Sequence, residues 1–231
     1  MVDFNMKISS RSYRGKSFRP SPYTHCEDDG SLLLVVTPWG NSNVAERAKD
    51  IVTDFILSSR NDNEATSPFQ KMTCITPLAN HVRVAMMLLN DTLYREENRE
   101  EYTEGVEIAI CAKNGNEITI AQVGQPFIFL SRKGFPLVPL TLGTDLAAEL
   151  SAPPKILSPL PHALLGLYST SNFSLQSFHW NPGDQLIFLT RSHFPMEFLS
   201  LPSGRRTLDE LSKVLSQDNS QIPFWLGITH L

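Results

Sequence analysis

The sequence contains no long hydrophobic run. No stretch approaches the roughly 18 consecutive apolar residues of a membrane-spanning helix, and no apolar stretch follows the basic residues near the N-terminus as in a secretory signal peptide. Cysteine is also scarce. The three cysteines, Cys26, Cys74 and Cys111, form no Cys-x-x-Cys pair, which argues against a disulfide framework and favours a reducing compartment. We therefore predict a soluble, cytoplasmic protein without a membrane partner.

Basic residues do not outnumber acidic residues in this sequence. The 20 Lys and Arg residues face 24 Asp and Glu, the net charge is −4, and no long basic stripe is present. This composition argues against a dedicated nucleic-acid binder. With 231 residues, of which 41% are hydrophobic, the chain fits one large domain with a substantial core.

A stretch rich in strand-forming residues runs from Glu104 to Thr141. Aliphatic side chains alternate on both sides of Asn114-Gly115, which we expect to supply the φ > 0 residues of a two-residue hairpin turn. A corner at 124–126 separates this hairpin from two further runs. We therefore predict one meander of four consecutive strands. The predicted strands cover residues 106–111, 118–123, 127–130 and 135–140.

Helical patterns flank this stretch. Apolar residues recur at intervals of three and four over 44–57, and again from the cap Thr76-Pro77 to about Tyr94. Thr207 to Glu210 form a capping box that opens a third helix. Residues 142–178 are rich in proline and are predicted to be a long loop. Further strands are expected at 31–36, 175–180, 185–190 and 222–228. The order of elements indicates an α+β fold.

Two blocks carry a family resemblance. The first is a strand, an Asn-Gly turn, a strand ending in Gly124, an aliphatic strand, a Lys-Gly turn and Leu140-Thr141. The second is Ala163-Leu164-Leu165-Gly166 followed by Pro182-Gly183-Asp184 and another aliphatic strand. In this order they resemble the type 2C, metal-dependent (PPM-type) Ser/Thr protein phosphatases. The resemblance implies a single type 2C phosphatase-like domain over residues 1–231, folded as a four-layer α-β-β-α sandwich of two antiparallel sheets flanked by helices.

The resemblance also implies a site for two Mg²⁺ or Mn²⁺ ions, which need several carboxylate ligands. The positions that match the metal-binding motifs carry no carboxylate in this sequence. Asp218-Asn219 lies two residues before the last of them, so a small insertion could restore that one pair. Arg191 differs most in charge, because a guanidinium keeps its proton and repels a dication. The matching positions are Thr24, Thr37, Pro38, Gln125, Arg191, Ser220 and Gln221.

The resemblance therefore predicts a catalytically inactive pseudophosphatase, without a bound cofactor, that acts as a regulatory module by binding another protein or a phosphoprotein segment. One alternative is an active phosphatase with a rearranged Mg²⁺ or Mn²⁺ site. The carboxylates that could help it are Glu27, Asp28, Asp29 and Asp218.

A second alternative is a sensor of anions or small ligands that uses Arg19 and Arg191. Each arginine also has a structural explanation: Arg19 as a solvated surface residue, and Arg191 as a group that satisfies polar atoms at a sheet end. Residues 24–29 contain His, Cys, Asp and Glu, but their spacing matches no zinc motif and favours a polar loop.

Overall fold

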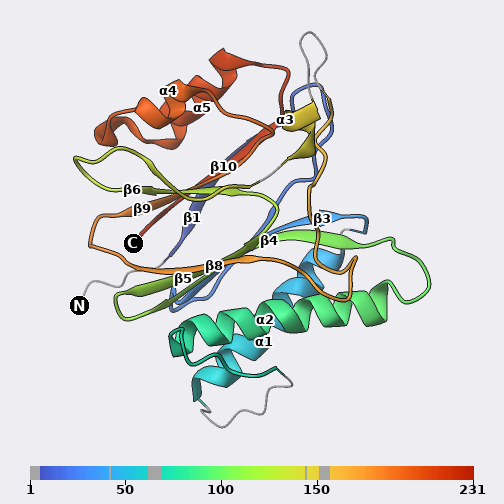
Figure 1. Cartoon of the computed structure of the whole chain (residues 1–231). Coiled ribbons are helices and arrows are strands. Elements are labelled where there is room, and N and C mark those ends of the chain that lie inside the picture. Colours follow the sequence, from blue (N-terminus) through green and yellow to red (C-terminus); the bar gives the residue numbers. More distant parts are fainter. Residues whose placement is uncertain (1–5, 42, 62–68, 144, 151–156) are drawn as a thin grey trace. The chain divides into compact units, whose positions relative to one another are not determined.

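The computed structural model describes residues 6–41, 43–61, 69–143, 145–150 and 157–231. By its contacts the chain divides into two compact units. The first unit comprises residues 1–21, 124–163 and 180–231, and the second unit comprises residues 22–123 and 164–179. Each unit contains one five-stranded antiparallel sheet (Figure 1). A single domain over residues 1–231 stays a prediction.

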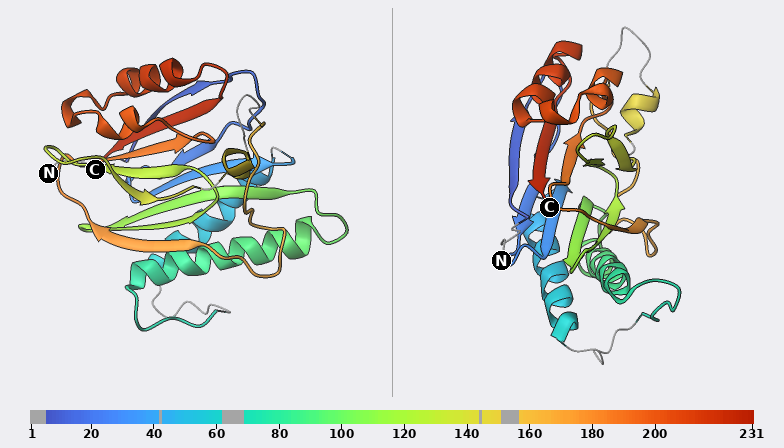
Figure 2. Two further views of the ribbon diagram at one scale, coloured as in Figure 1. Left: turned by 45° about the horizontal axis from the view of Figure 1, so that its top comes forward. Right: turned by 90° about the vertical axis from the view of Figure 1, so that its left-hand side faces the viewer.

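The sheet of the second unit carries its helices on one face (Figure 1, Figure 2). The strand order is β2-β3-β4-β5-β8, and each neighbouring pair is antiparallel. Two long helices contact β3, β4 and β5. The strands are β2 (Tyr23–Cys26), β3 (Leu32–Trp39), β4 (Gly105–Asn114), β5 (Glu117–Val123) and β8 (Ser174–His179), and the helices are α1 (Asn43–Asn61) and α2 (Pro77–Thr92).

The β4–β5 hairpin forms as predicted, with its turn one residue later. Asn114 pairs with Glu117, so the two-residue loop is Gly115-Asn116. Gly115 has a φ of 57°, whereas no described non-glycine residue has a positive φ. Asn114 therefore does not supply a φ > 0 position. A glycine at the first loop position matches a type II′ turn, whose twist suits a hairpin.

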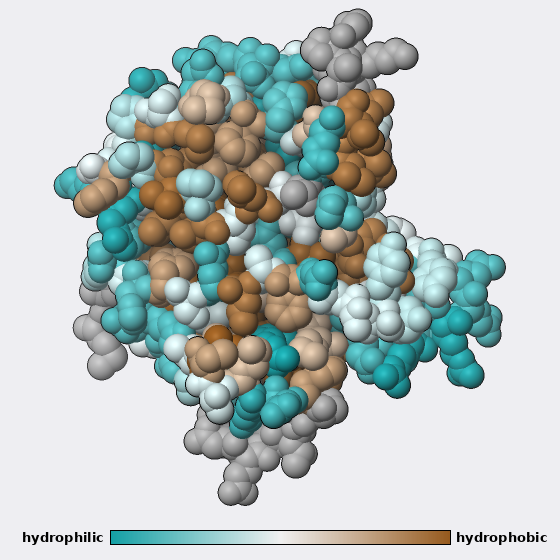
Figure 3. All heavy atoms as spheres, in the orientation of Figure 1, coloured by the Kyte–Doolittle hydropathy of each residue, from teal (hydrophilic) through white to brown (hydrophobic). Residues whose placement is uncertain are grey.

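Helix α2 begins where the sequence predicted. Thr76 is the N-cap, its hydroxyl accepts a hydrogen bond from the backbone N–H of Ala79, and Pro77 follows at the first position. The helix continues into η1 (Leu93–Glu97), a π-helical turn. Arg95 pairs with Asp91 at i,i+4. Arg95 is exposed, and in Figure 3 the surface near the end of α2 is mostly hydrophilic.

In the first unit, the sheet packs against short helices. The strand order is β1-β10-β9-β6-β7. Phe198, Leu211 and Leu215 of the helices join Phe129 and Ile187 of the strands in one hydrophobic cluster. The strands are β1 (Ile8–Tyr13), β6 (Phe127–Ser131), β7 (Val138–Thr141), β9 (Gln185–Thr190) and β10 (Phe224–His230), and the helices are α3 (Leu146–Leu150), α4 (Met196–Ser200), η2 (Ser203–Arg205) and α5 (Leu208–Asp218).

The prediction of a single four-stranded meander was wrong. β5 pairs with β4 and β8, whereas β6 pairs with β7 and β9 in the sheet of the first unit. Residues 124–126 therefore connect two sheets instead of forming a turn within one. Periodicity reports that a segment is a strand, but it does not report its partner.

Two short strands and two short α-helices were missed. β1 is an edge strand that is mostly exposed, so it shows no alternation of apolar residues, and it pairs only with β10. β2 includes Thr24, His25 and Cys26, where a polar loop was predicted. α3 and α4 have five residues each, too short for a periodic pattern. Pro153 and Pro154 of the predicted loop lie outside the described residues. No helix in the described part of the chain is long and apolar enough to cross a membrane.

Candidate functional site

Gln125 and Arg191 come together in the first unit. Gln125 precedes β6 and Arg191 follows β9, and both residues are fully buried. The Gln125 side-chain Nε2 donates to the carbonyl oxygen of Arg191 at 2.7 Å, and the Arg191 backbone N–H donates to Gln125 Oε1 at 2.8 Å. Two of the seven positions that were predicted to form a degenerate metal site are thus directly bonded to each other.

The guanidinium of Arg191 is turned toward the end of α5. Its Nη2 donates to Asp218 Oδ2 at 3.0 Å and to the carbonyl oxygen of Asn219 at 3.1 Å. Its Nε and Nη1 are buried and have no hydrogen-bond partner among the described residues. Burial lowers the pKa of Arg191, and the charge and hydrogen bond of Asp218 act in the opposite direction. An arginine stays protonated in proteins, so the site carries a fixed positive charge.

His193 lies beside this ion pair. Its Nε2 is 3.9 Å from Asp218 Oδ2. Burial lowers the pKa of His193, as does the nearby charge of Arg191, while Asp218 raises it. The imidazole is therefore uncharged at neutral pH.

The second arginine of the prediction, Arg19, is paired with a carboxylate that the sequence did not single out. Arg19 Nη1 lies 3.0 Å from Asp145 Oδ2, and the two side chains are 4% and 1% exposed. The explanation of Arg19 as a solvated surface residue is therefore wrong. Ser192, the neighbour of Arg191, donates its hydroxyl to the same Asp145 oxygen at 2.9 Å.

Asp145 has its other oxygen engaged as well. Oδ1 accepts hydrogen bonds from the backbone N–H groups of Ala147 and Leu160, both at 2.9 Å. The contact with Ala147 caps the short helix α3. An aspartate directly before Leu146–Leu150 is the signal that could have identified this residue. Arg19 and Leu160 are too distant from Asp145 in the sequence for these contacts to be predicted from local patterns.

At the C-terminal end of α5, Asp218 and Asn219 reach Arg191, and the aligned pair Ser220-Gln221 has a different role. Both residues of that pair are exposed. Their carbonyl oxygens accept hydrogen bonds from the Tyr13 hydroxyl at 2.9 Å and from the Lys16 backbone N–H at 2.8 Å. The pair thus fixes residues in and after β1.

The remaining predicted positions lie in the sheet of the second unit. Thr24 of β2 is opposite Val35, and Thr37 and Pro38 of β3 are opposite Glu107 and Val106. Thr37 is fully buried, and its hydroxyl has no hydrogen-bond partner within the described ranges. Glu107 is also buried and accepts a hydrogen bond from Trp39 Nε1 at 2.9 Å.

Three of the four acidic residues named for the active-phosphatase alternative lie at the β2–β3 turn. Glu27 is bonded to His25 Nε2 at 2.8 Å, Asp28 is exposed, and Asp29 accepts from the Ser31 backbone N–H at 2.8 Å. Each bonded carboxylate has a local partner. Asp218, the fourth candidate, belongs to the first unit.

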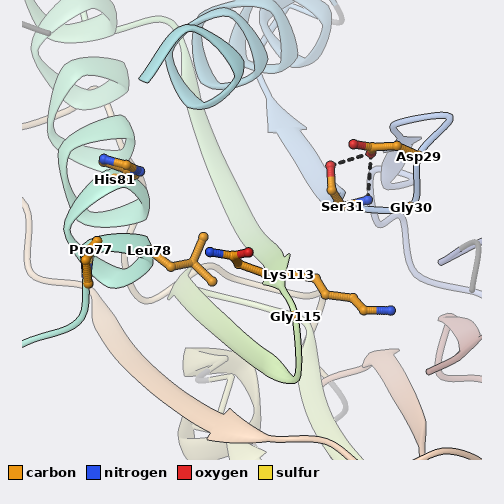
Figure 4. A pocket seen from close by; sticks show the side chains of 9 residues that line it. Asp29, Gly30, Ser31, Pro77, Leu78, His81, Lys113 and Gly115 are labelled. Carbon is orange, nitrogen blue, oxygen red and sulfur yellow. Dashed lines mark hydrogen bonds between the residues drawn. The ribbon is translucent and has the colours of Figure 1, made fainter. Parts of the chain in front are cut away.

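A cavity of about 490 Å³ lies near this turn, bordered by the start of α2 and the β4–β5 loop (Figure 4). Asp29, His81 and Lys113 contribute its ionisable side chains, and burial lowers the pKa of Lys113. In Figure 4 the Lys113 side chain extends away from His81. The three groups do not converge on one point, so this cavity does not form a recognisable catalytic site.

Solved structures of Ser/Thr phosphatases share the fold of this chain. The phosphatase PstP/Ppp of Mycobacterium tuberculosis matches with a TM-score of 0.62 and 15% identity, over 97% of this chain and 98% of its own. The PPM Ser-Thr phosphatase MsPP of Mycobacterium smegmatis, solved with cacodylate, matches with 0.66 and 12%, over 98% and 99%. PppA, a key regulatory component of T6SS in Pseudomonas aeruginosa, matches with 0.62 and 15%, over 97% and 96%.

These likenesses confirm the predicted fold class: an α+β fold of two antiparallel sheets flanked by helices, as in the PPM-type phosphatases. At such low identity they show the fold alone. A scan of the sequence against models of protein families finds no match, and a search of curated proteins finds none either.

The catalytic domain of PstP, a solved structure with this fold, has been solved in complex with two manganese ions. Within the residues that the structure describes, no group of three or more His, Cys, Asp and Glu side chains could hold a metal ion. The two carboxylates beside Arg191 and Ser192, Asp218 and Asp145, are each bound by an arginine. The described donor set therefore does not match the several carboxylates that a pair of hard dications requires, and loss of the metal site stays a prediction.

Proposed function

We propose that this chain is a catalytically inactive protein with the PPM phosphatase fold, and that it acts as a regulatory module by binding another protein or a phosphoprotein segment. The proposal includes a cytoplasmic location and no metal cofactor. Its main support is the buried guanidinium of Arg191, which is bonded to Asp218 and Asn219 at the end of α5. A cation held there raises the free energy of placing a dication nearby.

The comparisons support the regulatory part of the proposal by example. PppA has this fold and is described as a key regulatory component of T6SS in Pseudomonas aeruginosa. The three cysteines of this chain are free thiols, which is compatible with a reducing compartment.

The anion-sensor alternative has less support. It depends on two available cationic groups, and both arginines have carboxylate partners, Arg19 with Asp145 and Arg191 with Asp218. An anion would have to compete with these carboxylates, of which Asp145 is buried.

The proposal is tested by calorimetric titration with Mn²⁺ and by hydrolysis of an aryl phosphate, with and without a chelator. The catalytic domain of PstP serves as the positive control. We expect no micromolar Mn²⁺ binding by this chain and no turnover that the chelator abolishes. Micromolar binding together with chelator-sensitive turnover would establish the active alternative instead.

A further inference from the structure

A groove lined by tyrosines lies in the second unit, where η1 meets the segment before β8. It has a volume of about 620 Å³. Tyr102 and Tyr168 line this groove, and 67% and 70% of their surface is exposed, which is unusual for large aromatic side chains. The lining residues are Tyr94, Tyr102, Leu167, Tyr168, Ser169 and Thr170.

Two buried asparagines join the walls of this groove. Asn98 donates through Nδ2 to the carbonyl oxygens of Glu104 and Gly166 at 2.7 and 2.8 Å, and its Oδ1 accepts from the N–H groups of Thr103 and Glu104, both at 3.0 Å. Asn90 donates to the carbonyl oxygen of Tyr168 at 3.0 Å. The groove is therefore held in shape before a ligand binds, which lowers the entropic cost of binding.

Gly166 lets these walls approach. Its φ is 96°, and a Cβ at this position would lie 2.8 Å from Cβ of Leu93. Its N–H donates to Asn90 Oδ1 at 3.0 Å. Gly166 belongs to the Ala-Leu-Gly segment of the family resemblance, but in this chain its contacts serve the groove.

The tyrosines form a flat, hydroxyl-bearing surface. The rings of Tyr94 and Tyr102 are stacked, with centroids 6.4 Å apart and an angle of 28° between the planes. Leu167 is the only aliphatic lining residue. Such a surface offers stacking and single hydrogen bonds, but it lacks the deep apolar pockets that the buried face of a partner helix requires.

The surroundings are acidic. Residues 95–104 contain five glutamates and two arginines, a net charge of 2 − 5 = −3. Arg95 is paired with Asp91, and Arg47 of α1 is paired with Glu96 and Glu97. The exposed Glu100 and Glu101 directly precede Tyr102. A ligand that enters along this side meets negative charge next to aromatic rings, an arrangement that favours lysine or arginine.

We propose that this groove binds an extended, proline-rich segment of a partner protein that carries lysine or arginine beside its prolines. Such a segment already adopts a polyproline II helix, its rings pack on aromatic side chains, and its basic residues match Glu100 and Glu101. Such a segment is the class of partner that the proposed regulatory module would bind, so this proposal rests on the proposed function. The groove itself is independent of the Arg191 site.

The experiment uses the full chain and three fluorescent ten-residue peptides in an anisotropy titration: a proline-rich peptide with two arginines, the same peptide with glutamates for arginines, and a peptide with the same arginines but alanines for prolines. We expect saturable binding of the first peptide, and binding at least about tenfold weaker for each of the others. Absence of saturable binding up to millimolar peptide, or equal binding of the alanine peptide, would overturn the proposal.

Variants show whether the peptide occupies this groove. Tyr102→Ala and Tyr168→Ala remove exposed side chains, so we expect the fold to persist, with an unchanged circular dichroism spectrum, and peptide binding to weaken about tenfold. Leu142→Ala, a matched change at a residue of the first unit that is 71% exposed, should leave binding unchanged. If the tyrosine variants bind like the unaltered chain, the groove is not the binding site. Metal-dependent turnover would contradict the proposed function without affecting this result, and loss of peptide binding would leave the metal titration unaffected.

Discussion

The side chain of Gln125 continues the β6–β9 ladder by binding the backbone of Arg191. Phe127 is opposite Leu189 in that ladder, and Gln125 and Arg191 each lie two residues beyond this last pair. There the side-chain amide accepts from the N–H of Arg191 and donates to its carbonyl oxygen, 66 residues away in sequence. A glutamine amide has the donor and the acceptor of a peptide group, so it can replace one at a strand end.

The first prediction concerns this amide. In Gln125→Glu a carboxylate oxygen replaces the NH₂ group that lies 2.7 Å from the Arg191 carbonyl oxygen. One hydrogen bond is lost and a buried charge faces a carbonyl, so the free energy of unfolding should fall by about 2 kcal/mol. Urea denaturation measures it. Gln221→Glu, the same change at an exposed residue, should stay within about 0.5 kcal/mol. Equal effects of the two substitutions would contradict the prediction.

The second prediction concerns the charge on Arg191, with His193 as its reporter. Arg191 helps to lower the pKa of His193, so Arg191→Met should raise that pKa toward the ordinary value of about 6.5. Asp218→Asn should lower it further, because Asp218 acts in the opposite direction. Titration of the imidazole proton by NMR measures both shifts. Arg11→Met removes an exposed arginine that is paired with Asp209 and should leave His193 unchanged.

The same lowered pKa sets the sign of a pH effect. The unfolded chain takes up the His193 proton near pH 6.5, before the folded chain does. This residue therefore stabilises the fold less as the pH falls below about 6.5, and Arg191→Met should reduce that loss. A His193 midpoint that is the same in both variants and in the unaltered chain would refute the predicted role of Arg191.

The third prediction concerns the buried pair of Arg19 and Asp145. Asp145→Asn removes the negative charge from an oxygen that accepts from both Arg19 and Ser192. Breaking a buried ion pair from one side should lower the free energy of unfolding by about 3 kcal/mol. A double-mutant cycle with Arg19→Met should give a coupling energy above about 1 kcal/mol. Asp209→Asn, where the carboxylate is 80% exposed, should have little effect. A coupling near zero would mean that Arg19 is held by other contacts.

The fourth prediction concerns Asp184 of the Pro-Gly-Asp segment. Burial alone would raise the pKa of Asp184, but hydrogen bonds from Arg132 and the Asn181 backbone, with the charge of Arg132, lower it below its ordinary value. This carboxylate therefore stabilises the fold above about pH 4 and loses that contribution as the pH falls through the lowered pKa. Arg132→Met should cost about 2 kcal/mol at pH 7.

The pH dependence separates this effect from lost packing. The difference in unfolding free energy between Arg132→Met and the unaltered chain should shrink as the pH falls below about 4, because the stabilisation from ionised Asp184 in the unaltered chain is lost progressively as the pH approaches its lowered pKa. Denaturant unfolding at pH 7 and pH 3 measures the two differences. Lys133→Met, a change at the next basic residue along the chain, serves as the control. A difference that stays constant with pH would show that Arg132 acts through its hydrocarbon stem.

The sequence by itself determined the features that depend on neighbouring residues. Thr76-Pro77 fixed the start of α2 and Thr207 the start of α5, because a cap is a contact over three residues. Alternation of aliphatic residues located β4 and β5, continuous apolar runs located β6 and β9, and the order of these strands carried the resemblance that the shared fold confirms. The absence of carboxylates at Gln125 and Arg191 was also visible in the residues alone.

Only the tertiary structure decided which distant groups meet. It assigned β5 and β6 to different sheets, gave Arg19 its partner Asp145, and joined Tyr102 to Tyr168 across one groove. Each of these depends on long-range backbone pairing and on buried polar groups that must find partners wherever the chain brings them. Local patterns do not determine which strands and side chains become partners, because many strand pairings satisfy the same alternation of apolar residues.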